Sequence, residues 1–280
     1  MPLSSGNLPY DELATGLLSA VGSLAILLTY ALFPSLRNLR YVELVTYVAL
    51  NDLVASIGVM LGPSPNGSPA CWFQGMSSTF NYISSVFWVT TITYQVWVVV
   101  KRGPVIRNMI GFHLVSWGVP LALTLLPLTT STYDNPDDEP TWCFVADRKD
   151  SPAWSQLFWF IASFYIWLWG AMVLNAFLLL SILVELRSIS VVPPALKSTV
   201  LKLAFYPVIT ALSWSLNTTA NIYVFSRGGH YTTTNGTWTL IATVGVIMAI
   251  LQGFFNSLVF FYMNPLVRER WGWLGGEVWE

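Results

Sequence analysis

Seven apolar stretches of about 20 or more residues constrain the fold of this 280-residue chain more than any other feature. A helix rises 1.5 Å per residue, so about 20 residues cross the ~30 Å hydrocarbon core of a bilayer. The stretches are continuously apolar, whereas the strands of a membrane β-barrel alternate over about ten residues. The sequence therefore predicts an all-α membrane protein, a seven-transmembrane helix bundle with spans at 13–33, 42–61, 72–100, 109–128, 154–186, 198–225 and 238–263.

The basic residues predict how the bundle faces the membrane. Ten of the 13 Lys and Arg residues lie at one side of the predicted spans, and three lie at the other. Cytoplasmic loops carry the excess of Lys and Arg, so we expect the N-terminus outside and the C-terminus inside. The first span lacks the basic start of a signal peptide and is too long for one. It should be retained in a multi-pass protein of the plasma membrane.

Charge and composition also exclude classes of function. Only 10% of the residues are charged, against about a quarter in soluble domains. The chain has no block rich in Lys or Arg, so nucleic acid is not an expected partner. The two histidines, His113 and His230, fall on opposite membrane faces and cannot share a metal ion or serve a buried Ser-His pair. The seventh span has no lysine for a retinal Schiff base, so we expect neither an enzyme nor a cofactor.

Both cysteines fall on the predicted outer face. Cys71 begins the third span within Cys-Trp-Phe-Gln-Gly, and Cys143 lies in the long outer loop at 134–151. Disulfides persist in the oxidising environment outside the cell. A bridge would hold the loop over the mouth of the bundle; the alternative is two unpaired thiols in lipid-exposed positions. Two outer cysteines at this placement favour a seven-helix receptor.

Motifs along essentially the whole chain resemble the class E cyclic AMP receptors of slime moulds and their relatives. They are the motif at 71–75 with Phe-Trp at 87–88, Lys-Leu-Ala-Phe-Tyr-Pro at 202–207 followed by Trp214, and Leu-Gln-Gly-Phe-Phe-Asn at 251–256. The Gln-Gly pairs are also similar to those of secretin and adhesion receptors. The resemblance implies a G-protein-coupled receptor, with an extracellular ligand and a heterotrimeric G protein as partners.

Two features depart from known receptor families. The third span ends in Val-Val-Val-Lys-Arg at 98–102, without the acidic-Arg-aromatic triplet of rhodopsin-like receptors. The outer segments carry eight acidic residues against three basic ones, so an anionic ligand such as cyclic AMP would meet a repulsive field. The ligand is therefore not carried over from the resemblance.

Two alternatives to this function remain. One is a small transporter or channel; transporters often consist of repeated halves, and no repeat is evident in this sequence. The other is a constitutively active orphan receptor.

Three residues are candidates for an interior switch. Asp52 is the only carboxylate deep within a span, where a charge is expensive enough to indicate a role. It could form a polar network with Asn256 on the seventh span; the alternative is a structural group that is protonated or satisfied by water.

Pro207 must free a backbone carbonyl and bend the sixth span. The bend is interpreted as a hinge for outward movement of the cytoplasmic end, with a static kink as the alternative.

Polar and aromatic residues in the outer halves of the spans are candidates for the ligand pocket. The amides and hydroxyls recur at three- or four-residue spacing, which places them on one helix face. In lipid such groups must point inward or pair across helices, so interhelical hydrogen bonding is the alternative. Tryptophans could supply aromatic walls or simply lie at the membrane interface. The candidates are Gln74, Ser78, Asn81, Trp142, Trp214, Asn217, Asn221 and Trp238.

Cations around the predicted cytoplasmic mouth are candidates for contact with the G protein: Lys101, Arg102, Lys197, Lys202 and Arg268. They suit the C-terminal helix of an α subunit in a helix-in-groove contact. The alternative is that they only obey the positive-inside rule. We expect the receptor domain to span 1–263. The remainder, 264–280, begins with Asn-Pro and is expected to form an amphipathic helix on the inner membrane surface with a short tail, and the alternative is a disordered tail.

Two sequons mark possible glycosylation in outer loops. Asn66 begins Asn-Gly-Ser and Asn235 begins Asn-Gly-Thr. A third match at Asn217 lies at membrane depth, where the transferase cannot reach.

Overall fold

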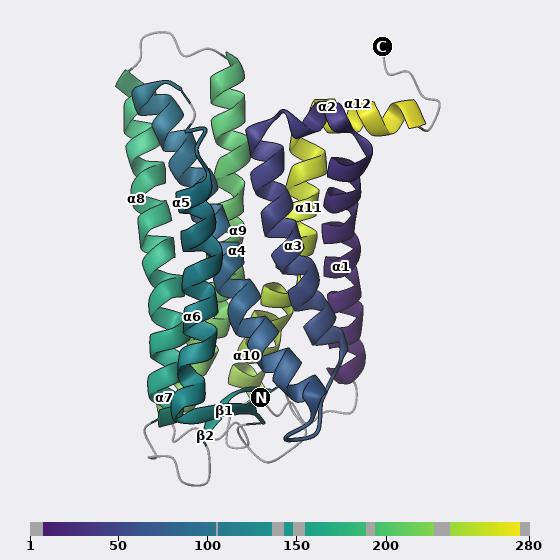
Figure 1. The fold of residues 1–280 in the computed structure, drawn as a ribbon, viewed down its shortest axis with the longest axis vertical. Helices are drawn as coiled ribbons and strands as arrows, with labels where there is room; N and C mark the ends of the chain where they lie inside the picture. Colours follow the sequence, from purple (N-terminus) through teal and green to yellow (C-terminus); the bar gives the residue numbers. More distant parts are fainter. Residues whose placement is uncertain are drawn as a thin grey trace.

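The structure is a computed structural model that describes residues 8–104, 106–135, 143–147, 155–188, 194–226 and 236–274. The predicted bundle is confirmed, because each of the seven apolar stretches is helical and the helices run side by side in Figure 1. The first three spans and the sixth are single helices: α1 (Leu8–Leu32), α3 (Arg40–Met60), α4 (Pro69–Arg102) and α9 (Pro194–Ser226). The short helix α2 (Pro34–Arg37) joins α1 to α3.

The fourth, fifth and seventh spans are interrupted helices. The fourth consists of α5 (Ile110–His113), the π-helical turn η1 (Leu114–Gly118), α6 (Val119–Leu125) and the 3-10 turn η2 (Leu126–Thr129). The fifth consists of α7 (Ser155–Phe160), the π-helical turn η3 (Ile161–Tyr165) and α8 (Ile166–Ser188). The seventh bends by 50° between α10 (Gly236–Ile250) and α11 (Gln252–Met263).

Proline chemistry accounts for the interruptions of the fourth span. Pro120 has no N–H, and its ring pushes away the carbonyl one turn earlier, so the π turn η1 lies where this misfit must be absorbed. Pro127 lies in η2, where the helix tightens before it ends. These prolines therefore shape the helix locally, in agreement with an ordinary static kink.

The membrane character of the helices follows from their length and composition. Among the described residues, five helices are long and apolar enough to cross a membrane, and α10 with α11 adds a sixth if the bent pair is one span. The remaining helix, α9, is 33 residues long and carries polar side chains on several of its turns. Five of its polar side chains are buried: Thr210, Ser213, Asn217, Thr218 and Asn221. Polar groups on α9 thus avoid lipid by facing the bundle, while the orientation of the termini stays a prediction.

The two ends of the bundle differ in structure. The hairpin end carries the antiparallel strands β1 (Ser131–Asp134) and β2 (Phe144–Asp147), and α12 (Pro265–Leu274) lies across the opposite end, called the α12 end (Figure 1). Trp271 fixes α12, because its Nε1 donates to Thr29 Oγ1 at 3.0 Å and its ring packs on Phe33. The helix predicted after the last span therefore exists, and its position on a membrane surface stays a prediction.

Two apolar clusters form the core and meet along α4. The cluster nearer the hairpin end includes Ile83, Val86, Phe164, Leu168 and Trp214. The cluster nearer the α12 end includes Trp88, Ile92, Tyr206 and Phe260. The segment of α4 between Ile83 and Trp88 carries Ser85, so polar side chains enter the bundle where the two clusters meet.

Candidate functional site

A hydrogen-bonded network crosses the bundle between the two apolar clusters. Asp52 on α3 is only 4% exposed. Its Oδ1 accepts from Ser85 Oγ on α4 at 2.9 Å, and its Oδ2 accepts from Asn256 Nδ2 on α11 at 2.7 Å. Gln252 on α11 donates through Nε2 to Ser85 Oγ at 3.3 Å and accepts at Oε1 from Trp214 Nε1 on α9 at 2.9 Å. These five side chains, the Asp52 network, join four helices.

Donor and acceptor chemistry fixes the direction of each bond in the Asp52 network. The indole of Trp214 can only donate, so Gln252 turns its oxygen toward Trp214 and its NH2 toward Ser85. Ser85 has one hydroxyl proton and accepts from Gln252, so it directs that proton to Asp52. Removing one member therefore leaves a buried group on another helix unpaired, which costs about 1–3 kcal/mol.

Gly253 allows three helices to meet beside the carboxylate. A Cβ at this position would lie 2.5 Å from Ser19 Oγ, 2.6 Å from Ser23 Oγ and 3.0 Å from Asp52 Cβ. Small residues at such crossings let membrane helices approach backbone to backbone. The bend between α10 and α11 comes directly before Gln252, whose amide then reaches α9 and α4. The Gln-Gly pair thus combines a hydrogen-bonding side chain with a close helix contact.

Polar atoms beside the network are buried without a hydrogen-bond partner in the described part of the chain. They are Ser19 Oγ, Ser23 Oγ, Ser213 Oγ and Asn256 Oδ1. Buried polar groups are normally hydrogen-bonded. These atoms are therefore hydrogen-bonding groups that the observed arrangement leaves unused among the described residues.

The structure brings Asp52 and Asn256 into direct contact. Pro207 is buried on α9, about two turns from Trp214, but it has no polar side chain and is not a member of the network. Ser85, Gln252 and Trp214 were not assigned to the network from sequence. Ser85 is a polar residue within an apolar span, Gln252 lies in the family motif at 251–256, and Trp214 was instead a candidate wall of the ligand pocket. The role of these residues as a switch stays a prediction.

Gln74 has a structural use at the hairpin end. Its Nε2 donates to the carbonyls of Gly58 and Gly62, at 3.1 Å each, and its Oε1 accepts from Cys143 N at 3.0 Å. The side chain is fully buried. Gln74 thereby holds the end of α3, the start of α4 and the hairpin together, and its contact with a ligand stays a prediction.

The other polar candidates on α4 are also buried. Asn81 Nδ2 donates to Ser77 O on the same helix at 2.7 Å. Ser78 Oγ is buried without a partner among the described residues. A ligand contact at either position stays a prediction, and Trp142 lies outside the described residues.

The candidates on α9 and α10 contact neighbouring helices. Asn221 Nδ2 donates to Tyr165 OH on the fifth span at 2.9 Å and to Asn217 Oδ1 at 3.1 Å. Trp238 stacks on Tyr223, with 3.9 Å between ring centroids. Asn221 thus makes an interhelical hydrogen bond and Trp238 an interhelical ring contact, and contact of these side chains and Asn217 with a ligand remains a prediction.

The predicted disulfide between Cys71 and Cys143 is confirmed, with an S–S distance of 2.00 Å. It ties the start of α4 to β2. Tyr133 on β1 is fully buried against α4, where a Cβ at Gly75 would lie 2.6 Å from the tyrosine ring. Its hydroxyl donates to Thr124 O at 2.9 Å. Burial raises the pKa of Tyr133 to about 12.

The candidate cations at the α12 end have different surroundings. Lys101 Nζ lies 3.3 Å from Glu185 Oε2, which pairs the ends of α4 and α8. Arg268 donates through Nη1 to Tyr262 O at 2.6 Å, at the end of α11. Lys202 extends into a cavity. The side chains of Arg102 and Lys197 lie outside the described part of the structure, and contact of all five cations with a G protein stays a prediction.

Only one of the two predicted glycosylation sites can be placed. Asn66 is exposed at the hairpin end, and its Oδ1 accepts from Asn135 N at 3.2 Å. Asn235 lies outside the described residues. Glycosylation at both stays a prediction.

The profile of the slime mold cyclic AMP receptor family matches residues 12–279. The chain belongs to this family. "G-protein coupled receptor 1" of Arabidopsis thaliana is 30% identical over 266 residues, which cover 90% of this chain and 76% of that protein. "G-protein coupled receptor 157" of Mus musculus is 34% identical over 150 residues, covering 50% of this chain and 45% of that protein. "Cyclic AMP receptor 4" of Dictyostelium discoideum is 23% identical over 276 residues, covering 95% and 59%.

The family resemblance predicted from the motifs is therefore confirmed. Squid rhodopsin superposes with a TM-score of 0.73 at 15% identity, over 96% of this chain and 85% of that one. At this identity the superposition shows the fold alone, that of a seven-helix receptor. The chain spans about half the length of the mouse relative and 59% of the slime-mould one.

Proposed function

We propose that this protein is a G-protein-coupled receptor that transmits an extracellular signal to a heterotrimeric G protein by movement of the α12 end of α9. Membership of the family and the relatives named as G-protein-coupled receptors support this function. In this proposal the hairpin end faces outward and the α12 end faces the cytoplasm, as the basic residues predict. The family and fold are those of receptors, and neither favours the transporter alternative.

The Asp52 network is the observation that supports the mechanism most directly. Through Trp214 it ties α9 to three other helices at the middle of the bundle. A ligand at the hairpin end that changes the position of α9 would stretch the bond from Trp214 to Gln252. The unpartnered atoms nearby would then favour a second arrangement, and the ligand would shift the population between the two.

Pro207 separates the held part of α9 from the part that is proposed to move. Proline cannot donate to the carbonyl four residues earlier, so the helix is weakened between Leu203 and Pro207. Trp214 lies on one side of this point and Lys202 on the other. A bend at Pro207 would swing the α12 end of α9 while Trp214 changes little.

Hydrogen bonds and an ion pair hold the fifth span to α4, so these two helices would form a fixed side of the proposed G-protein site. Three contacts follow one another along the two helices, and they pair Thr90 with Asn175 at 2.8 Å, Trp97 with Ser181 at 3.0 Å and Lys101 with Glu185 at 3.3 Å. We therefore expect α4 and α8 to stay together when α9 moves. The space between them and α9 would receive the C-terminal helix of the α subunit.

The extracellular ligand is a separate part of the proposal. The relative of this protein in Dictyostelium discoideum is named a cyclic AMP receptor. In this chain, however, the excess of acidic residues in the outer segments opposes the approach of a phosphate anion. We therefore propose an outer ligand other than a simple anion. Nucleotide exchange measured with and without cyclic AMP tests this: stimulation by cyclic AMP would contradict it.

Charge reversal tests the proposed contact with the G protein. Lys101→Glu and Lys202→Glu, made separately, should lower the rate of nucleotide exchange on purified heterotrimeric G proteins, because each removes a cation from the cytoplasmic mouth. Arg270→Glu, at an exposed position on α12, is the matched control. If both variants reach the surface and drive exchange at the parental rate, these lysines do not contact the G protein and only follow the positive-inside rule.

A further inference from the structure

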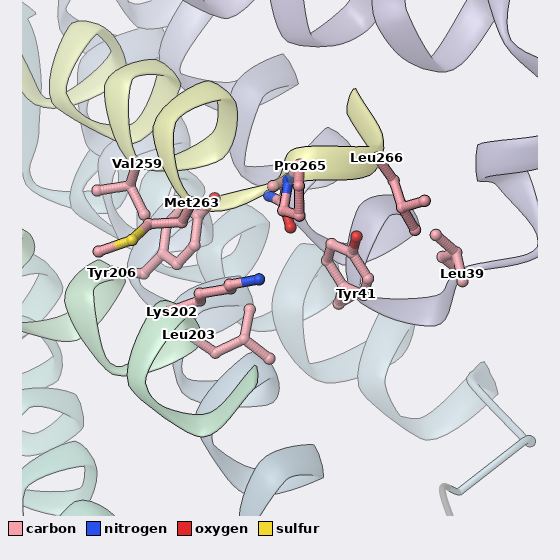
Figure 2. A pocket seen from close by; sticks show the side chains of 10 residues that line it. Leu39, Tyr41, Lys202, Leu203, Tyr206, Val259, Met263, Pro265 and Leu266 are labelled. Atoms are coloured by element: carbon pink, nitrogen blue, oxygen red, sulfur yellow. The ribbon is translucent and has the colours of Figure 1, made fainter. Parts of the chain in front are cut away.

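A cavity of about 180 Å³ opens at the α12 end among α3, α9, α11 and α12. Figure 2 shows its lining, which includes Tyr41 on α3, Leu203 and Tyr206 on α9, and Met263 at the end of α11. One water needs only about 15 Å³ of such space, so the cavity has room for a group of several atoms. Most of the wall is apolar, and Lys202 supplies its one ammonium group.

Lys202 extends across this cavity toward Tyr41 and Pro265 (Figure 2). In the described part of the chain the ion pairs are Arg40 with Glu43 and Lys101 with Glu185, so Lys202 has no ion-pair partner there. The side chain is half-buried. An ammonium group held beside apolar walls is less well solvated than one in water, which strengthens its attraction to an anion.

The start of α12 adds a second attraction for negative charge. Asn264, Pro265 and Leu266 line the cavity, so the N-terminal end of this ten-residue helix opens onto it. A helix N-terminus carries partial positive charge. Pro265 has no N–H, and the amides of Val267 and Arg268 both donate to Asn264 O, at 3.1 and 3.2 Å, so among the described residues Leu266 N–H is the donor that this turn leaves for a ligand.

The carbonyl oxygens at the end of α11 would repel an anion, but two of them already accept hydrogen bonds from side chains. Asn264 Nδ2 donates to Phe260 O at 2.7 Å, and Arg268 Nη1 donates to Tyr262 O at 2.6 Å. The other nearby arginines are also engaged, Arg37 with Tyr30 O and Arg40 with Glu43. Among the described residues, Lys202 is therefore a cation that lines a cavity and has no ion-pair partner.

We propose that this cavity binds an amphiphilic anion with a single phosphate or carboxylate head. The head would lie between Lys202 Nζ and the first turn of α12, and a short apolar part would pack on Leu203, Val259 and Met263. One ammonium group and one helix terminus suit a head of low charge rather than a polyphosphate. The source is either an inner-leaflet phospholipid or a soluble amphiphile.

Occupancy would also affect signalling, and this part rests on the proposed function. A ligand between Lys202 and α12 would join α9 to α11 and α12. It would hold the α12 end of α9 inward and cover Lys202, which the proposed contact with the G protein also uses, so an occupied site would slow nucleotide exchange. Binding itself is measured without a G protein, so failure of the receptor mechanism and failure of the site give different results.

Titration with butyl phosphate tests the site. We expect one saturable site by ligand-observed NMR on the purified, disulfide-intact protein in neutral detergent. The uncharged analogue butanol should not compete. Lys202→Gln should weaken binding about tenfold, because it removes a charge-assisted bond. Arg270→Gln, an exposed cation outside the cavity, should bind like the parental protein.

Two further variants keep the result interpretable. Met263→Trp fills the apolar part while leaving Lys202 in place, and it should also weaken binding. Lys202→Arg should retain binding within about threefold, since it keeps the charge. Unchanged binding in both Lys202→Gln and Met263→Trp would overturn the proposal, as would competition by butanol equal to that of the phosphate.

The source of the anion is distinguished in nanodiscs. If the natural occupant is a lipid, discs containing phosphatidylglycerol should reduce butyl phosphate binding relative to phosphatidylcholine discs, and only in protein that retains Lys202. Equal binding in the two discs would assign the site to a soluble amphiphile. A reduction that persists in Lys202→Gln would place the lipid effect elsewhere and count against the site.

Discussion

At the scale of single residues, two hydrogen bonds hold the carboxylate of Asp52, and an asparagine at this position can reproduce them only in part. Its two oxygens accept from Ser85 and Asn256, which lie on different helices. An asparagine has one oxygen and one NH2, so it cannot accept both bonds in the same way. The Oδ1 of Asn256 is buried without a partner among the described residues. A flip of the Asn256 amide would let it accept from the new NH2.

We therefore predict that Asp52→Asn changes the basal and stimulated rates of nucleotide exchange with little effect on folding. The flipped amide preserves the contact with α11, but the charge that favours one arrangement of the network is lost. Thermal unfolding and exchange on purified G proteins measure the two effects. Thr46→Val is the control, because Thr46 bonds only to Val42 O on its own helix. Parental exchange rates in Asp52→Asn would show a purely structural carboxylate.

At the scale of elements, the hairpin is held to the bundle by a covalent bond and by shape. The disulfide joins it to the start of α4, where Ser68 Oγ caps the helix by accepting from Cys71 N at 3.1 Å. Tyr133 enters the space that Gly75 leaves open. The Gln-Gly motif after Cys71 thus supplies one residue that bonds the hairpin and one that makes room for it.

Removing the disulfide should loosen this element. The bridge spans 72 residues, and its loss should destabilise the protein by up to about 4 kcal/mol in the chain-entropy model. We expect Cys143→Ser to lower the thermal midpoint and surface expression. The double variant with Cys71→Ser should lose no more than the single one, because the bond is broken once. Free alkylation of both thiols in folded, unreduced protein would contradict the bridge.

At the scale of the whole molecule, side-chain contacts hold α4 to α8 at the α12 end, whereas the end of α9 is not held to its neighbours in the same way. The contacts between α4 and α8 continue to Lys101 and Glu185. The α12 end of α9 instead borders the cavity that contains Lys202. A bundle built in this way favours movement of α9 against a fixed pair.

Distances between spin labels test this asymmetry. Labels at positions 102 and 198 should move apart when a G protein binds, because the end of α9 swings outward from α4. The control pair, at positions 102 and 188, should keep its distance, since α4 and α8 are cross-linked. Both distances are measured by electron–electron dipolar spectroscopy. An unchanged separation between 102 and 198 would refute the hinge at Pro207.

The sequence alone determined the helices, the disulfide and the family, because these depend on apolar length, on two cysteines and on motifs that are local in the chain. It also placed Asp52 and Asn256 in one interior layer. Only the tertiary structure decided that Ser85, Gln252 and Trp214 complete the network. Each π turn inserts a residue and rotates the following helix by about 100°, and the bend before Gln252 redirects its side chain. Which polar groups meet therefore depends on how helices rotate and bend against one another, and spacing along one helix does not contain that information.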